Sequence, residues 1–359
     1  MKSNWTYSDI FDLEYFFYRD REIGEPQLHD RDRSIYLDLK KQHGRESVST
    51  SSLLLSWLNS SRTSLDQTEK TTLPGTLISE ALRLLAMLLP LSGIIFGMLS
   101  GLAFFTYSGK APVNVFHFLF LFVFSQLILL LILLIRQLFK RIGLARYSFP
   151  SLFKLYTSLT AVLASKLHRR LQSSVSGSQQ AIYQQFLGLA KTAHHKYGQL
   201  LYWPFFSLSQ RTIIGFNAGL LGASLFRITT SDLAFGWQST IQFSSSALYQ
   251  GLKILALPWS WLLPADISYP SLTAIEGSRI ILKDGIYHLA TQNLVAWWPF
   301  LILCLLVYGL LFRIILMIAG QLTQRHRLNT IRFDNADVLS VLRRMQSPLV
   351  STQAKEDVH

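Results

Sequence analysis

The sequence has little charge and almost no cysteine. Charged residues make up 15% of its 359 residues, against about 25% in an average soluble domain. The single cysteine, Cys304, lies in an apolar stretch, which excludes a disulfide within the chain and a zinc site built on cysteines. Half of the residues are hydrophobic, a balance that is typical of a protein solvated partly by lipid.

Basic residues outnumber acidic ones, and the formal net charge is +13. Such an excess is found in nucleic-acid-binding proteins and also in membrane proteins, which place Lys and Arg in their cytoplasmic loops. We favour the second interpretation and expect lipid, not nucleic acid, as a partner. The N-terminal stretch contains Asp9, Asp12 and Glu14 and has no basic start followed by an apolar run, so we expect no cleaved signal peptide.

Four apolar segments are candidates for membrane spans. They cover residues 84–106, 112–135, 212–226 and 295–320. At ~1.5 Å per residue, helices of this kind cross the roughly 30 Å hydrocarbon layer. The third has only 15 residues between Arg211 and Arg227, whose long side chains reach the two interfaces. The fold class that we predict is an all-α membrane protein with about four transmembrane helices.

The distribution of Lys and Arg predicts the orientation. Residues 1–83 hold 11 of them, 136–210 hold 10 and 321–359 hold 6, whereas 107–111 hold one and 229–294 hold three. Because cytoplasmic segments carry the excess of positive charge, we predict that both termini lie in the cytoplasm.

The parts between the spans follow from this layout. We expect the following division: 1–58, a cytoplasmic helical N-terminal unit; 59–83, a linker; 84–135, a transmembrane hairpin; 136–210, a central cytoplasmic loop of amphipathic helices; 211–320, spans three and four with an apolar outer segment at 229–294; and 321–359, a cytoplasmic tail. Within the outer segment, residues 241–263 carry only Lys253 as a charge and contain Pro258. This stretch is either re-entrant or lies on the surface, and we favour the surface-lying form, since a fifth span would place the C-terminal arginines outside.

Glycines recur at helical spacing in two of the spans. The residues are Gly93, Gly97 and Gly101 in the first span and Gly215, Gly219 and Gly222 in the third. Small residues four apart let two helix backbones approach closely in lipid. We therefore predict that spans one and three pack together, either within one chain or across a homo-oligomer. The alternative is the ordinary enrichment of glycine in membrane helices.

Two polar residues within the spans are candidates for a role there, and no carboxylate lies in any span. Arg313 lies about 15 residues, ~23 Å, after Trp298, and we expect its side chain to snorkel to the nearer interface. Asn217 lies at a similar depth, so we also consider a hydrogen bond between the two. The absence of Asp and Glu from the spans disfavours a proton-coupled transporter.

No catalytic, cofactor-binding or metal-binding constellation is found. His194 and His195 are adjacent, so on a helix they cannot form the i, i+4 pair that binds zinc. The sequence has no Walker motif, nucleophile elbow or dinucleotide fingerprint. We therefore expect no enzyme, no cofactor and no metal.

Several short patterns resemble a bacterial membrane family catalogued as domain of unknown function 2868. They are residues 12–16 (DLEYF), 31–35 (RDRSI), 112–114 (PVN), 235–240 (FGWQST) and 306–311 (LVYGLL). Phe312 departs from the family pattern, in which a proline precedes the arginine. The resemblance implies a membrane protein that is often encoded beside a predicted P-loop GTPase, although this chain has no phosphate-binding loop itself.

The function that we expect is a membrane anchor or docking component for a soluble cytoplasmic partner, a GTPase if the resemblance holds. The candidate docking residues are Phe11, Phe16, Phe17 and Arg31, because aromatic and Arg side chains dominate protein interfaces. The three rings alternatively pack on the central loop of the same chain. A small oligomeric channel or transporter is the alternative function.

Overall fold

The computed structural model describes residues 5–43, 49–106, 112–141, 178–238, 244–280, 290–331 and 333–348. Contacts divide the chain into two compact units. The head comprises the described residues of Met1–Leu84, Ser151–Phe205 and Gln321–His359, and the bundle those of Leu85–Pro150 and Phe206–Gly320. Helices dominate both units, as the composition predicts. Within the described residues, the exception is one short strand pair.

The head is built from short amphipathic helices. They are α1 (Tyr7–Arg19), η1 (Asp20–Glu22), α2 (Glu25–His43), α3 (Thr50–Thr63), α4 (Gln67–Thr72) and α16 (Ala336–Gln346), together with the first turns of α5 (Pro74–Phe104). Helix α1 begins at a capping box, in which Thr6 accepts from the Asp9 N–H and the Asp9 side chain accepts from the Thr6 N–H. Its last turn holds Arg19, which complements the helix dipole.

Residues from both ends of the chain share the core of the head. Its N-terminal members include Ile10, Leu13, Leu54, Trp57 and Leu58, and its C-terminal members are Leu328, Phe333, Val338, Val341 and Met345. Each such apolar side chain contributes roughly 1.5–3 kcal/mol when it is fully buried. The stretch 59–83, which we expected to be a linker, is instead largely helical. Leu65 and Leu73 anchor it, because both side chains are buried in this core.

Four helical segments of the structure are long and apolar enough to cross a membrane: Pro74–Phe104, Val115–Ile132, Tyr202–Thr230 and Thr291–Asn329. They coincide with the four spans predicted from the sequence. The third is longer than expected, because it belongs to a single helix, α9 (Ser178–Thr230). Of the predicted central loop, residues 142–177 lie outside the described part of the chain.

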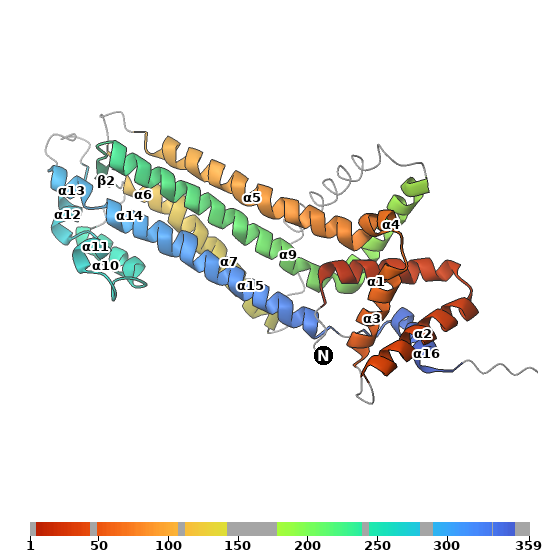
Figure 1. The fold of residues 1–359 in the computed structure, drawn as a ribbon. Helices are drawn as coiled ribbons and strands as arrows, with labels where there is room; N and C mark the ends of the chain where they lie inside the picture. The colour runs from red at the N-terminus through yellow and green to blue at the C-terminus, as the bar shows by residue number, and fades with distance from the viewer. Residues whose placement is uncertain are drawn as a thin grey trace, which may run out of the picture. The chain divides into compact units, whose positions relative to one another are not determined.

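The second and fourth spans are each interrupted by a π-helical segment. The second runs through α6 (Val115–Phe118), η2 (Leu119–Phe124) and α7 (Ser125–Arg141). The fourth runs through α13 (Thr291–Val295), α14 (Trp298–Cys304), η3 (Leu305–Leu311) and α15 (Phe312–Asn329). The π-helical segments η2 and η3 contact each other inside the bundle, and Figure 1 shows the bundle helices running side by side. Such segments change the direction of the side chains that follow them.

One end of the bundle carries a small folded cap, which we define as the described residues of 231–280. It begins with β2 (Phe235–Gly236), which pairs in parallel with β1 (Val113–Asn114) from outside the cap. Helices α10 (Ser245–Ala256), α11 (Ala265–Ser268) and α12 (Leu272–Gly277) follow. The indole N–H groups of Trp237 and Trp259 in the cap donate to the carbonyls of Ile275 and Ser268, at 2.6 and 3.1 Å. The cap is therefore an ordered element with satisfied buried polar groups.

Candidate functional site

A polar cluster lies among the apolar helices of the bundle. We define it as Gln126 on α7, Gln210 and Asn217 on α9, and Arg313 on α15. All four side chains are buried, with exposed fractions of 7%, 2%, 0% and 1% respectively. Gln126 and Arg313 each lie two residues after the end of a π-helical segment. A π-helical turn is wider than an α-helical turn and changes the direction of the side chains that follow it. Both side chains point toward the same position inside the bundle.

The two amides of the cluster form a reciprocal pair. The Nε2 atom of Gln126 donates to Oδ1 of Asn217 at 2.7 Å, and Nδ2 of Asn217 donates to Oε1 of Gln126 at 3.1 Å. Each amide also donates back to its own helix, to the carbonyls of Phe122 and Ile213. Interhelical amide bonds of this kind fix the register of helices in lipid.

Gly309 makes room for this pair. A Cβ atom at this position would overlap the side-chain amide of Asn217. Gly309 lies on η3, within the 306–311 pattern that carries the family resemblance. The glycine is therefore required by the approach of α9 to the fourth span at the level of the amide pair.

Arg313 is the charged member of the cluster and has weak partners. Its Nη1 atom donates to Oε1 of Gln210 and its Nη2 atom to the carbonyl of Gln126, both at 3.5 Å. Its Nε–H has no partner, and no ion pair to Arg313 occurs within the described residues. A guanidinium does not lose its proton in proteins, so it is a buried charge that the surrounding dipoles offset only in part.

The structure corrects two expectations about these residues. Arg313 does not snorkel to an interface, because its side chain points into the bundle and is 1% exposed. No hydrogen bond joins it to Asn217 within the described residues; instead, Gln126 contacts both. Gln126 and Gln210 were missed by the sequence reasoning. Isolated glutamines within or at the end of apolar runs were the signal that was available.

The glycines of spans one and three lie against each other inside the chain. An added Cβ at Gly97 would overlap the carbonyl of Phe216, and one at Gly219 would overlap the carbonyl of Ile94. Gly93 and Gly215 make equivalent close approaches, and Gly101 faces Ala223. Gly222 does not take part, because a Cβ there would meet nothing within 4 Å. Helices α5 and α9 therefore pack through five of the six predicted glycines.

The candidate docking rings are not on the surface. Phe11, Phe16 and Phe17 are 7%, 3% and 5% exposed, and they belong to the core of the head. Phe16 and Phe17 pack on the indole of Trp57, with ring centroids 6.3 and 5.8 Å apart. The three rings face α3 and the C-terminal residues of the head, and they are therefore unavailable to a partner in this structure.

Arg31 belongs to a buried network of charges. It donates to both carboxylate oxygens of Asp20, at 2.9 and 2.8 Å, and to Oδ1 of Asp32. Asp32 also accepts from the Trp57 indole at 2.7 Å and from Nε of Arg344 at 2.8 Å. Burial by itself would lower the pKa of Arg31, but the two carboxylates outweigh this effect and raise it. The network ties α2 to α3 and α16, so its role is structural.

A second network joins α1 and α3 to the start of α5. Arg62 pairs with Asp9 at 2.7 Å and with Asp12 at 2.5 Å, and the Gly75 N–H donates to Asp12 at 2.7 Å. Burial raises the pKa of Asp12, and Arg62 and the Gly75 N–H offset that shift only in part. Burial would lower the pKa of Arg62, but its carboxylate partners raise it. Asp12 thus caps a buried N-terminal N–H of α5 that has no acceptor within the helix.

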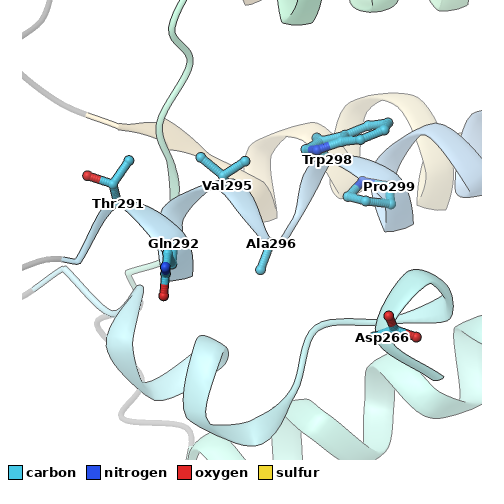
Figure 2. Close-up of a pocket in the computed structure, with 7 residues that line it drawn as sticks. All are labelled: Asp266, Thr291, Gln292, Val295, Ala296, Trp298 and Pro299. Carbon is cyan, nitrogen blue, oxygen red and sulfur yellow. The ribbon is translucent and has the colours of Figure 1, made fainter.

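Two pockets lie among the described residues. One, of about 410 Å³, lies between α11 and the junction of α13 with α14 (Figure 2), and is lined by Asp266, Thr291, Gln292, Val295, Ala296, Trp298 and Pro299. The other, of about 360 Å³, lies in the head and is lined by Ser8, Asp12, Arg62, Lys70, Leu73, Thr76 and Ser79. Neither pairs a nucleophile with a base. Within the described residues, no group of three His, Cys, Asp or Glu side chains is placed to hold a metal ion.

The chain matches the family described as a protein of unknown function, DUF2868, over residues 157–358. This match covers more than half of the sequence, so the chain belongs to that family. It includes α9, the cap, the fourth span and α16, and therefore most of the polar cluster. No curated protein and no solved structure matches the chain.

Proposed function

We propose that the protein is an integral membrane protein of the bacterial inner membrane whose head acts as a docking platform for a soluble cytoplasmic partner. A P-loop GTPase is the partner class that the family resemblance implies. The observation that carries this proposal is the head itself. It is a folded body with its own core and buried charge networks, and it is joined to segments that are apolar enough to span a membrane.

The surface that we propose for docking is the outward stripe of α2. Its members are Asp30, Ser34, Leu37, Asp38 and Lys41, which are exposed and recur at helical spacing. Leu37 is 42% exposed and lies at the centre of the stripe, with polar or charged residues on either side. An apolar centre within a polar rim is the usual anatomy of a transient interface. The buried rings of α1 hold the head rigid behind this stripe.

The docking proposal is tested with the full chain in nanodiscs. The probe is a P-loop GTPase of the class that the resemblance implies, whose Kd is measured with GTP and with GDP bound. Leu37→Glu should weaken binding about tenfold, the effect expected of an interface anchor. Leu339→Glu is the matched control, since Leu339 is 58% exposed on α16 and lies outside the stripe. Absence of binding by the wild type, or equal losses in both variants, would contradict the proposal.

The orientation is tested by reporter fusions. Fusions after Pro112 and Asp266 should report the outer side, and fusions after Ser176 and Val358 the cytoplasmic side. The Lys and Arg counts support this arrangement. A cytoplasmic signal at Asp266 would refute it.

A channel or transporter is the second candidate, and the polar cluster is the observation that favours it. A buried guanidinium among apolar helices is a common feature of substrate and ion pathways. Ion flux from liposomes that hold the purified protein tests this function. If the wild type mediates flux and Arg313→Met abolishes it, the transport function replaces the docking function.

A further inference from the structure

Residues 244–263 of the cap form a helix followed by a compact turn. Helix α10 begins at Ser244, whose hydroxyl accepts from the Ala247 N–H at 3.2 Å. After Ala256 the chain turns through residues 257–263 and continues to α11. From the sequence we predicted a surface-lying position for this stretch. Its contacts with the fourth span bear directly on that choice.

These contacts lie well inside the span. The Tyr308 hydroxyl donates to the Leu255 carbonyl at 2.7 Å, and the Trp259 ring packs on Tyr308 and Phe300 with centroids 5.8 and 6.1 Å apart. Tyr308 follows Trp298 by ten residues, or about 15 Å of helix. Because helical side chains lean toward the N-terminus by up to a turn, the contact lies about 10–15 Å below Trp298. Half of the hydrocarbon layer has a similar thickness.

Apart from Lys253, the outward face of this segment is apolar and open. Ile254, Leu257, Trp261 and Leu262 are 65%, 62%, 78% and 69% exposed. Scattered exposed apolar residues are ordinary, but four on one helix and its turn form a patch that water disfavours. The same packing places the patch beside the fourth span, where Leu306 and Leu311 are also exposed. The patch therefore continues the apolar surface of the bundle, and Figure 1 shows α10 beside α14.

Most backbone N–H groups of the turn are paired internally. The N–H groups of Leu257, Trp259, Ser260, Leu262 and Leu263 donate to carbonyls within residues 254–259. The exposed Trp261 indole N–H donates to the Pro258 carbonyl at 2.9 Å, and the Ser268 hydroxyl donates to the Leu263 carbonyl at 3.1 Å. A segment in hydrocarbon must pair its polar groups in this way, because lipid tails offer no hydrogen bonds. A turn in water has no such requirement.

We propose that residues 244–263 are a re-entrant element that enters the leaflet at the cap end of the bundle and contacts lipid acyl chains through Ile254, Leu257, Trp261 and Leu262. This inference rests on the proposed membrane embedding but on neither the docking function nor the orientation. It replaces the surface-lying interpretation, because a segment that bonds Tyr308 lies too deep for the headgroup layer. The side chains of Trp261 and Leu262 therefore displace lipid in one leaflet only.

Site-directed spin labelling tests the proposal on the full chain in liposomes. Cys304→Ala removes the only thiol, and single cysteines are then introduced as Ile254→Cys and Trp261→Cys, on separate turns. Leu129→Cys, at a site that is 53% exposed on the second span, is the lipid reference, and Glu276→Cys on α12 is the aqueous reference. Collision rates with oxygen, which concentrates in hydrocarbon, and with a water-soluble nickel chelate give the depth of each label.

Labels at 254 and 261 should collide with oxygen as the label at 129 does, with at least a fivefold lower nickel accessibility than the label at 276. Nickel accessibility equal to that at 276 would overturn the proposal and place the segment in water. Protection from both agents would also overturn it, because protein, such as a second copy of the chain, would then cover the patch. If the label at 129 also reports water, the membrane embedding itself fails.

Discussion

Replacing Arg313 with methionine tests the claim that this guanidinium is an under-compensated charge. Methionine keeps an unbranched side chain of similar length and removes the charge. On insertion scales an arginine at the centre of a membrane helix costs about 2.5–3.5 kcal/mol, and we take this value for Arg313 because its buried side chain does not reach the interface. The variant loses two hydrogen bonds of 3.5 Å, each worth about 0.5 kcal/mol at this length. We therefore expect Arg313→Met to stabilise the bundle by about 1.5–2.5 kcal/mol.

The assay uses the single thiol of the chain. Cys304 is buried in the fourth span, so a maleimide dye that fluoresces on reaction reports the temperature at which the bundle opens. For a unit of this size the predicted stabilisation raises Tm by roughly 3–10 °C. Arg313→Gln, which removes the charge but keeps hydrogen-bonding groups, should give a smaller increase. A lower Tm for Arg313→Met would refute the reasoning, because it would show that the guanidinium has a stabilising partner.

Three further predictions address the packing of both units. Gly97→Leu or Gly219→Leu should destabilise the bundle by about 1–3 kcal/mol or prevent its assembly. Gly222→Leu, with open space at its Cβ, should melt like the wild type. Equal effects at all three positions would contradict the close packing of α5 on α9. In a double-mutant cycle, Gln126→Leu and Asn217→Leu should couple by about 1 kcal/mol, and additive losses would argue against the amide pair. Arg344→Ala should destabilise the head by about 2 kcal/mol, because it removes a charged hydrogen bond from the fully buried Asp32; an unchanged midpoint in urea unfolding would contradict this.

The sequence predicted the parts of the fold that depend on local composition. The four spans and the packing of α5 on α9 through glycines could be predicted, because apolar length and the four-residue spacing of small side chains have direct physical meaning in lipid. The expectations that depend on distant partners were wrong. Phe16 and Phe17 were candidate docking residues because the sequence does not show that Trp57 covers them. Arg313 was expected to snorkel because its depth is readable from the sequence, whereas its direction depends on the π-helical segment that precedes it.

The roles of the motif residues also depend on distant partners that the sequence does not show. Arg31 and Asp32 were noted for their resemblance to a family pattern, and the structure places them in a network that includes Arg344. Gln126 and Gln210 carried no motif and lie in the polar cluster. Pairings between residues that are hundreds of positions apart leave no periodic signal in one sequence. The contacts within the head and within the polar cluster could therefore be found only from the three-dimensional structure.

The shared core of the head also sets an order of events during synthesis. Phe333, Val338 and Met345 complete a core whose other half, up to Leu58, emerges almost the whole chain earlier. At ~5–20 residues per second the ribosome needs roughly 15–60 s to cover this interval. All four spans leave the ribosome within it. The N-terminal half of the core therefore stays partly uncovered while the membrane segments insert, and the head closes last.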